Sequence, residues 1–465
     1  MSTTTVAALN GLLLAIGVLL AGSMLLFAIV SIREGEPRAF RRAILAAFLL
    51  PLPYVLAGIL GLTTDSIAPA SVLLAISIVL FLMLLLPFGN HFPEGDDTPS
   101  TRFDERDVMF SRRNLKPGSE RFEEYYRDKP NIKELDDNFR KRPGLMEPGA
   151  LYHDPISAAS ANASFDTVAA FHSILDRDKG GSRQVRLDRD EISRFIKQWS
   201  LQLGAVSSGI AELKDYHLYS HIGRGDRYGE PVTLAHDFAI VITVEMDKSS
   251  VDSAPYGPEL METAQQYLNS GAIAVQIAEF IRYLGCSARA HIDGSYRVIC
   301  PLVARDAGLG EIGRMGLLMT PELGPRVRLA VVTTDMPLVA DGRKRDLSMI
   351  DFCEKCLKCA DVCPSNSIPT GGREMIDGAL RWKINAESCF TYWCTIGTDC
   401  GLCMRSCPYS HPDNTMHNIV RAGLKRSALS RRLALVLDDF FYGRIPARAP
   451  IPSWMAIEVS DTRES

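Results

Sequence analysis

The apolar positions divide the chain into a strongly hydrophobic start and a longer, mixed remainder. Three runs near the N-terminus, 6–32, 43–63 and 67–90, hold no charged side chain. At about 1.5 Å of rise per helical residue, each run is long enough to cross a hydrocarbon core of about 30 Å. The pattern therefore predicts a transmembrane anchor of three helices over residues 1–92.

The charges around these runs predict their orientation. No basic segment precedes the first run, which is also longer than a typical secretory signal core, so a cleaved signal peptide is the weaker interpretation. The loop after the first run is basic, whereas the short loop at 64–66 is not; its arginines are Arg33, Arg38, Arg41 and Arg42. By the positive-inside rule the arginine loop is cytoplasmic, so residues after 90 face the cytoplasm. We expect a multi-pass protein of the inner membrane, with membrane lipid among its partners.

Residues 93–170 are polar and rich in Pro, Gly and Asp, yet aromatic residues such as Phe103, Phe110 and Phe122 recur. We interpret this stretch as a segment that wraps over the following domain rather than as a free linker.

Helical and strand patterns alternate from 171 to 345. Residues 188–205 place apolar side chains at helical intervals, and 238–246 form a short β-branched run typical of a buried strand. A long helix is predicted over 259–285, ending at a glycine, and a second strand over 326–334. This alternation indicates an α/β domain.

Nine of the eleven cysteines lie between residues 353 and 407. The first four have the C-x2-C-x2-C-x3-C-P spacing of half a bacterial 4Fe-4S ferredoxin, in which three thiolates hold one cluster and the fourth crosses to the other. The C-x2-C-x3-C-P ending recurs at Cys400, Cys403 and Cys407. The spacing predicts a ferredoxin-like segment over 346–412 with two 4Fe-4S clusters, followed by a C-terminal extension over 413–465. Cluster 1 would be held by Cys353, Cys356, Cys359 and Cys407, and cluster 2 by Cys363, Cys400, Cys403 and either Cys389, which we favour, or Cys394.

Other roles for these cysteines fit less well. Disulfide frameworks are expected in small secreted chains, and zinc ribbons also use C-x2-C pairs but not two C-x3-C-P endings. The outlying Cys286 and Cys300 are predicted to be buried as small hydrophobic residues. A net charge of -4 over 465 residues gives no case for a nucleic-acid partner.

Two shorter motifs invite a cofactor assignment. Gly308, Gly310 and Gly313 satisfy G-x-G-x-x-G, but the preceding PLVARDA predicts a helix, whereas the dinucleotide fingerprint follows a strand. We expect these glycines to form a tight turn against another flat ligand. DYHLYS nearly matches the D-x-H-x-x-G sequence of some corrinoid sites, but Ser220 replaces the glycine, so His217 is expected to be a surface or core residue.

As a whole, YSHIGRGDRYG, HDFAIVITVEMD, QQYLNSGAIAVQIAEFIRYLG, AGLGEIGRMGLLMTPELGPRVRLAVVTTDMPL and DFCEKCLKCADVCP resemble the corrinoid-dependent reductive dehalogenases, in particular the branch that carries membrane helices. The resemblance extends from about residue 102 to 446. It implies a corrinoid held largely by backbone groups and hydrogen bonds, in a domain like the flavin nitroreductases, and two 4Fe-4S clusters that relay electrons to cobalt. The substrate would be a small organohalide, and the electron donor a low-potential ferredoxin, flavodoxin or quinol.

The resemblance also implies a proton donor. It assigns that role to Tyr267, beside a basic residue that would lower the tyrosine's pKa; Arg328 matches this residue best, with Arg326 as the near alternative. Many members carry an asparagine in a turn that lines the pocket, whereas this chain has Asp293 and Ser295 there. Two other functions remain open: a corrinoid iron–sulfur reductase resembling epoxyqueuosine reductase, and a membrane-bound ferredoxin. The extension contains a basic amphipathic helix that can lie on an anionic membrane surface or pack on the core.

Overall fold

A computed structural model describes residues 3–64, 67–87, 89, 95–177, 187–455 and 457. The chain forms two compact units, one of residues 1–93 and 413–447 and the other of residues 94–412 and 448–465. The short loop predicted at 64–66 and the end of the third apolar run fall partly outside the described residues.

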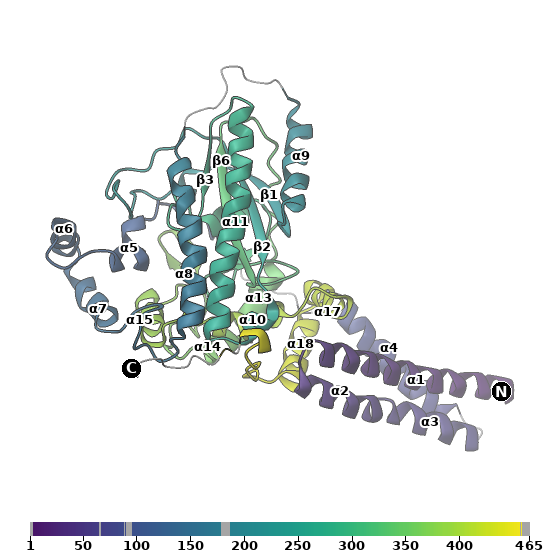
Figure 1. The fold of residues 1–465 in the computed structure, drawn as a ribbon. Coiled ribbons are helices and arrows are strands. Elements are labelled where there is room, and N and C mark those ends of the chain that lie inside the picture. The colour runs from purple at the N-terminus through teal and green to yellow at the C-terminus, as the bar shows by residue number, and fades with distance from the viewer. Residues whose placement is uncertain are drawn as a thin grey trace. The chain divides into compact units, whose positions relative to one another are not determined.

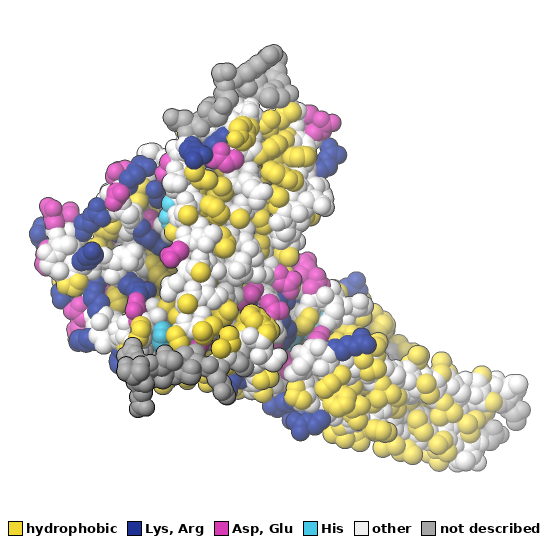
Figure 2. All heavy atoms as spheres, viewed as in Figure 1, with side chains coloured by type: hydrophobic (Ala, Val, Ile, Leu, Met, Phe, Trp, Pro, Cys, Tyr) yellow, Lys and Arg dark blue, Asp and Glu magenta, His cyan; other side chains and the backbone are white. Residues whose placement is uncertain are grey.

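The first unit is helical and contains the predicted anchor. Its apolar helices are α1 (Thr3–Arg33), α2 (Pro37–Leu49), α3 (Leu52–Thr63) and α4 (Ala68–Leu85). Within the part of the chain that the structure describes, three segments are long and apolar enough to cross a membrane, and α2 and α3 together make the second, Pro37–Thr63. Figure 2 shows hydrophobic side chains over much of the surface of these helices. The three predicted spans are thus present as apolar helices.

The second span differs from the sequence prediction in two ways. It is interrupted between α2 and α3, because Pro51 and Pro53 lack the amide hydrogen that a continuous helix requires. It also begins earlier than predicted, so Arg38, Arg41 and Arg42 lie in the first turns of α2 rather than in a loop. The basic cluster remains at the end of the span.

The C-terminal extension contributes α17 (Thr415–Arg426) and α18 (Ala428–Phe441) to the same unit. The hydroxyls of Ser427 and Ser430 donate hydrogen bonds of 3.2 and 2.9 Å to the carbonyls of Met83 and Leu84 at the end of α4. Phe441 packs edge-on against Phe27 of α1, with ring centroids 4.9 Å apart. The basic amphipathic segment therefore packs on the anchor helices.

A four-stranded antiparallel sheet forms the centre of the second unit, in the order β1-β2-β6-β3. The predicted strands are β2 (Phe238–Glu245) and β6 (Val327–Thr334), which pair along their full lengths, and sequence reasoning missed β1 (Ser207–Glu212) and β3 (Ala288–His291). The long predicted helix is α11 (Gly257–Tyr283), which packs on the sheet beside α8 (Pro155–Ala170), while α9 (Arg189–Gln202) contacts β1 (Figure 1). Apolar residues of these helices and strands form the largest core cluster.

Short elements complete this unit. Before the sheet lie α5 (Met109–Arg113), α6 (Glu120–Asp128) and α7 (Pro130–Arg140), with α10 (Lys248–Asp252) between β2 and α11. After β3 come α12 (Cys300–Asp306) and the hairpin of β4 (Glu311–Ile312) and β5 (Leu318–Met319). The cysteine-rich part contains α13 (Leu347–Cys356), α14 (Lys358–Asp361), a hairpin of β7 (Glu374–Ile376) and β8 (Ala379–Arg381), α15 (Ala386–Ile396) and α16 (Leu402–Arg405). Single 3-10 turns lie at Glu105–Asp107, Phe171–Ile174, Asp215–His217, Pro408–Ser410 and Ser453–Met455.

The segment 95–170 is folded against the rest of this unit. Phe110 packs edge-on against Phe390 of α15, with ring centroids 5.4 Å apart, and Phe122 belongs to a buried cluster with Tyr125 and Tyr126. The aromatic residues that argued against a free linker therefore occupy packed positions.

Candidate active site

A cavity of about 570 Å³ lies in the second unit, between the sheet domain and the cysteine-rich part. Tyr267 of α11, Arg328 of β6 and Tyr296 line one part of it. Four cysteines line another part: Cys363, Cys389, Cys400 and Cys403. The structure thus brings the predicted catalytic pair and one predicted cysteine set to the same cavity, and part of its volume is the space that a group held by these cysteines would fill.

Arg328 lies over the ring of Tyr267, with its guanidinium carbon 5.2 Å from the ring centroid. One Nη donates a 2.8 Å hydrogen bond to the hydroxyl of Thr263, and the same nitrogen is 3.6 Å from the carboxylate of Asp399. The arginine is held in place by these contacts, and its Nε has no hydrogen-bond partner among the described residues. Arg326, the near alternative, pairs with Glu245 at 2.7 Å and is not among the described cavity-lining residues.

The electrostatics of Tyr267 differ from the expectation. Burial raises the pKa of Tyr267 above its ordinary value, and the charge of Arg328 opposes this rise without overcoming it. The Arg328 charge acts in the predicted direction, but desolvation of the phenolate is the larger effect, so the net pKa of Tyr267 lies above its ordinary value. At neutral pH the Tyr267 hydroxyl is protonated, the state that a proton donor needs.

The sequence analysis did not identify two buried carboxyl groups next to Arg328, those of Glu259 and Asp399. Glu259 is completely buried, and burial together with the neighbouring Asp399 raises the pKa of Glu259 well above its ordinary value. Glu259, Thr263 and Tyr267 follow each other at intervals of four residues, so they share one face of α11. The E-x3-T-x3-Y spacing, which places three polar side chains on one face of the helix, is the sequence signal that could have indicated this group.

The electrostatic neighbours of the thiols bear on the two predicted sets, which stay a prediction; Cys359 also acts on Cys403. Burial raises the pKa of Cys407, and the thiols of Cys353, Cys356 and Cys359 add to the rise, which places these four together. In the same way burial and then Cys363 raise the pKa of Cys389 to about 11, and Cys389 in turn acts on Cys400 and Cys403. Cys394 instead packs with Met109, Phe139 and Phe390. The geometry favours Cys389 over Cys394 as the companion of Cys363.

The arrangement of the thiols bears on the metal they would hold. Among the described residues, no three His, Cys, Asp or Glu side chains converge on the position of a single ion. A zinc site requires that convergence, whereas a 4Fe-4S cluster gives each thiolate its own iron and so a wider spacing. Burial raises the pKa of Cys359 to about 12, whereas hydrogen bonds from Ser365 and neighbouring backbone amides outweigh burial and lower the pKa of Cys363.

The three glycines of the G-x-G-x-x-G match are not among the described residues that line the cavity. Gly308 has φ of +77° after the end of α12, where only glycine is unstrained. A Cβ at Gly310 would lie 2.1 Å from the carbonyl oxygen of Met319, and one at Gly313 would lie 2.7 Å from the Met319 side chain. The expectation that they hold a flat ligand is therefore not supported; these glycines allow the β4–β5 hairpin to pack closely.

Comparisons with known proteins agree with this site. Residues 352–411 match the description of a 4Fe-4S dicluster domain. The tetrachloroethene reductive dehalogenase of Sulfurospirillum multivorans is 34% identical over 207 residues, which cover 43% of this chain and 41% of that protein. Over this part, the chain is similar to the reductive dehalogenases. It spans about two fifths of the length of the first curated relatives that it matches.

The fold of this chain has a solved counterpart. A structure titled "Reductive dehalogenase structure suggests a mechanism for B12-dependent dehalogenation" superposes with a TM-score of 0.61 at 24% identity, covering 76% of this chain and 49% of that chain. The epoxyqueuosine reductase of Salmonella typhimurium is 25% identical over 235 residues, which cover 44% of this chain and 57% of that protein. The mixed helix and sheet fold with a ferredoxin-like part is thus the dehalogenase fold.

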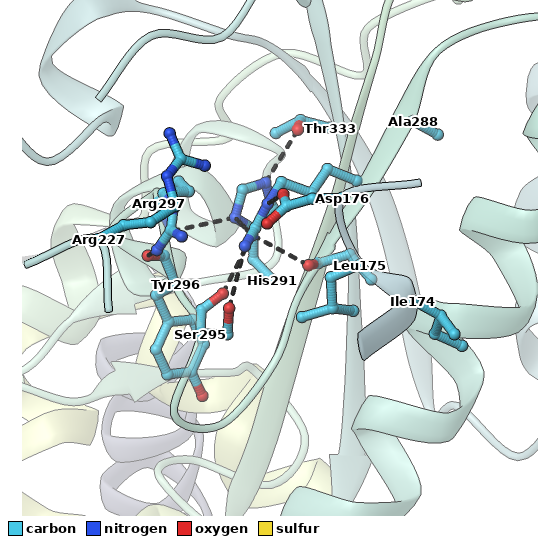
Figure 3. Close-up of polar contacts among 12 residues, drawn as sticks. Ile174, Leu175, Asp176, Arg227, Ala288, His291, Ser295, Tyr296, Arg297 and Thr333 are labelled. Atoms are coloured by element: carbon cyan, nitrogen blue, oxygen red, sulfur yellow. Dashed lines mark hydrogen bonds and ion pairs between the residues drawn. The ribbon is translucent and has the colours of Figure 1, made fainter. Parts of the chain in front are cut away.

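In this chain, a polar network fixes the turn that carries Tyr296, one of the residues that line the cavity (Figure 3). The buried Nδ1 of His291 accepts hydrogen bonds of 3.1 Å from Arg289 and from the backbone amide of Arg297. His291 Nε2 is 2.9 Å from the hydroxyl of Thr333 on β6. Burial, aided by Arg289, lowers the pKa of His291 well below its ordinary value, so the ring is neutral and acts as a fixed spacer.

The remaining sequence predictions near the site have simple outcomes. The carboxylate of Asp293 is not among the described cavity-lining groups, and burial raises its pKa. The hydroxyl of Ser295 is 3.0 Å from Arg289 in the network above. His217 is a core histidine, 2.9 Å from Asp306. Cys286 and Cys300 are buried as expected, and Cys300 also lines the cavity.

Proposed function

We propose that the chain catalyses reductive dehalogenation, in which an organohalide, two electrons and one proton give the hydrogen-substituted compound and a halide ion. The observation that carries this proposal is the single cavity that joins Tyr267 and Arg328 to Cys363, Cys389, Cys400 and Cys403. The reaction needs a proton donor and a carrier of single electrons at one cavity. Tyr267 would be the proton donor, and the four cysteines would hold the electron-carrying cluster. The printed name of the S. multivorans relative supports an organohalide as the substrate class.

The proposed cofactors are two 4Fe-4S clusters and a cobalamin-type corrinoid. The cavity offers aromatic and apolar side chains to the faces of a corrin ring, among them Tyr219, Tyr296, Met315, Leu317 and Trp393. At the cysteine side, the cavity-lining hydroxyls of Ser365 and Ser367 lie 2.6 Å apart, and that of Ser367 also lies 2.7 Å from the hydroxyl of Ser388. When bound, the corrinoid would supply a strongly reduced cobalt for attack on the carbon–halogen bond, and the clusters would supply single electrons.

The side chains of the chain have the following roles in this proposal. Tyr267 donates the proton from its hydroxyl oxygen, and Arg328 at 5.2 Å from its ring stabilises the phenolate that remains. Asp399 and Thr263 fix the guanidinium of Arg328 over the ring. The apolar walls exclude water, which strengthens the interaction between Arg328 and the phenolate.

We also keep the domain scheme as a proposal, with a nitroreductase-like corrinoid domain over 171–345 and a ferredoxin-like domain over 346–412. The catalytic part faces the cytoplasm, because Arg33, Arg38, Arg41 and Arg42 cluster at one end of the anchor. The ends of α1 and α4 and the start of α2 meet α17 and α18 at this end, since Arg42 donates to the carbonyl of Phe440 and Ser430 to that of Leu84. The extension thus supports the same sidedness as the arginines.

The outer face of α18 fits the lipid interface. Val436 is 65% and Phe440 42% exposed, and the basic Lys425, Arg426 and Arg432 are exposed on the same helical pair. Apolar side chains flanked by cations are typical of helices that lie at an anionic membrane surface. We propose that α17 and α18 rest there.

Two other functions are weaker. An epoxyqueuosine-reductase-like activity on tRNA requires a basic groove, which a net charge of -4 does not favour. A pure electron carrier does not require the sheet domain or the paired Tyr267 and Arg328.

Anaerobic reconstitution of the detergent-purified protein with iron, sulfide and cobalamin tests the proposal. We expect about eight irons and one cobalt per chain, and halide release from an organohalide with a low-potential reductant. Iron without retained cobalt would support the electron carrier instead. Cobalt without halide release across chlorinated and brominated aliphatic and aromatic compounds would contradict the dehalogenase.

A further inference from the structure

Arg314, between β4 and β5, is a buried cation with an unusual set of partners. It is 2% exposed, and its guanidinium donates only to backbone carbonyls: Nε to Cys353 at 3.0 Å, Nη1 to Pro369 and Gly371 at 2.8 and 2.6 Å, and Nη2 to Glu354 at 3.2 Å. No carboxylate forms an ion pair with Arg314 among the residues that the structure describes. Its charge is therefore not neutralised by a salt bridge.

A buried charge of this kind is costly unless an opposite charge lies near it. Arg373, which packs on the same indole of Trp382, has such a partner in Glu354 at 3.6 Å. Arg314 lies closer to the indole, at 4.8 Å, and the indole itself packs on Cys353. The carboxylate of Glu354 also acts electrostatically on Arg314, but its ion pair among the described residues is with Arg373.

The negative charge that would balance Arg314 is expected from the first cysteine set, which lies next to it. The backbone next to Arg314 touches that set, because a Cβ at Gly313 would lie 3.7 Å from the Sγ of Cys353. Cys353 and Cys359 also act electrostatically on Arg314, although burial, the larger effect, lowers its pKa. A guanidinium nevertheless stays charged at neutral pH.

We propose that Arg314 is the counter-ion of cluster 1 and raises its reduction potential. This rests on the iron–sulfur part of the proposed function. A 4Fe-4S cluster on four thiolates is negatively charged, and one electron from a low-potential donor makes it more negative by one unit without a proton. A fixed cation nearby therefore stabilises the reduced cluster more than the oxidised one. Arg314 acts as a positioning residue, since it also ties the cluster loop to the segment 369–371.

The second cysteine set has a different environment. Glu259 and Asp399 both act on Cys400, and the cation there, Arg328, lies 3.6 Å from Asp399. Removing the charge of Arg314 should therefore affect one cluster and leave the other unchanged.

The test is a redox titration of the reconstituted full-length protein in detergent, with dithionite as reductant and electron paramagnetic resonance as the readout. In Arg314→Gln we expect one cluster to lose at least tenfold in its ratio of reduced to oxidised form at fixed potential, equal to a midpoint lowered by about 59 mV for one electron. Arg314→Lys keeps the charge but not the planar fork. At the same fixed potential, its ratio of reduced to oxidised cluster should therefore stay within threefold of the native ratio. Unchanged midpoints in Arg314→Gln, or an equal shift in Arg314→Lys, would overturn the proposal.

If Arg314→Gln fails to bind iron, a second pair of variants, Gly371→Asp and Gly371→Asn, tests the same proposal. A side chain at Gly371 meets open space beside the carbonyl that accepts from Arg314. Gly371→Asp adds a carboxylate to compensate Arg314 and should lower the same midpoint by a smaller amount, whereas Gly371→Asn should not. Equal midpoints in these two variants would reject the proposal. None of these measurements uses cobalamin or an organohalide, so they are independent of a failure to release halide.

Discussion

The replacement Tyr267→Phe removes the proposed proton and little else. Phenylalanine keeps the ring on which Arg328 stacks at 5.2 Å and the contact with Phe165, whose ring centroid is 6.2 Å away. No hydrogen bond joins the Tyr267 hydroxyl to another described residue, so its loss leaves no partner unsatisfied. We expect the variant to fold, bind iron and cobalt, and melt within a few degrees of the native protein.

The effect on catalysis should be large. At an effective dielectric constant of about 20, two unit charges roughly 5 Å apart interact by about 3 kcal/mol, about a hundredfold in rate, and this sets the scale for the stabilisation of the phenolate by Arg328. General acids contribute roughly 10²–10⁴-fold. We therefore expect Tyr267→Phe to lower kcat by about 10²–10⁴, with KM changed by less than about threefold because the hydroxyl acts in the transition state.

The assay is halide release by the reconstituted protein with a low-potential reductant, compared with Arg328→Lys and the double variant. Arg328→Lys keeps the charge and loses the stacked fork, so a smaller loss is expected. In the Tyr267→Phe background the same lysine should have almost no further effect, because there is no phenolate to stabilise. Full turnover in Tyr267→Phe, or additive losses in the double variant, would refute this account of the pair.

Three further predictions concern other parts of the second unit. Cys389→Ser should lower the iron content by about one cluster, whereas Cys394→Ala should keep it, and equal losses would reject the assignment of Cys389. The folded-state pKa of His291 is lowered from 6.5, so its contribution to stability is present above about pH 6.5 and is lost at lower pH, by up to about 1.4 kcal/mol per pH unit. His291→Gln should therefore flatten the fall in melting temperature between pH 7 and pH 5. Parallel melting curves for the variant and the native protein would contradict this. Gly310→Ala should destabilise the protein by roughly 1–3 kcal/mol, because its Cβ would overlap the Met319 carbonyl, while Gly371→Ala should be nearly neutral in the same thermal-unfolding measurement.

The sequence predicted features that depend on local spacing. The cysteine blocks predicted the two thiol sets, because in the ferredoxin spacing three thiolates of a block hold one cluster and the fourth crosses to the other. The anchor followed from length and hydropathy, and the break at Pro51 was present in the sequence as two prolines within one apolar run. Resemblance to a family, rather than pattern, was needed for Tyr267, since an amphipathic helix places many tyrosines at its surface.

Features that depend on distant segments could not be predicted in this way. Strand β3 has the sequence ARAH, whose arginine and histidine argue against burial until the network of His291 and Thr333 is seen. Strand β1 contains two serines and a glycine, and a Cβ at Gly209 would lie 2.8 Å from the carbonyl of Ala307. In both strands, tertiary contacts outweigh the weak intrinsic preference for strand structure.

The polar face of α11 shows how the fold and the proposed chemistry depend on each other. Glu259 and Thr263 are buried in a helix whose other buried positions are mostly apolar, and burying polar groups costs stability unless they find partners. Arg328 serves the whole face, since it donates to Thr263, stacks on Tyr267 and lies beside Glu259 and Asp399. Breaking such a buried charge group costs about 3–5 kcal/mol, so the arginine cannot swing away from the tyrosine without destabilising the domain. Beside the apolar core, these polar contacts between α11 and β6 therefore also keep a cation fixed over the proposed proton donor.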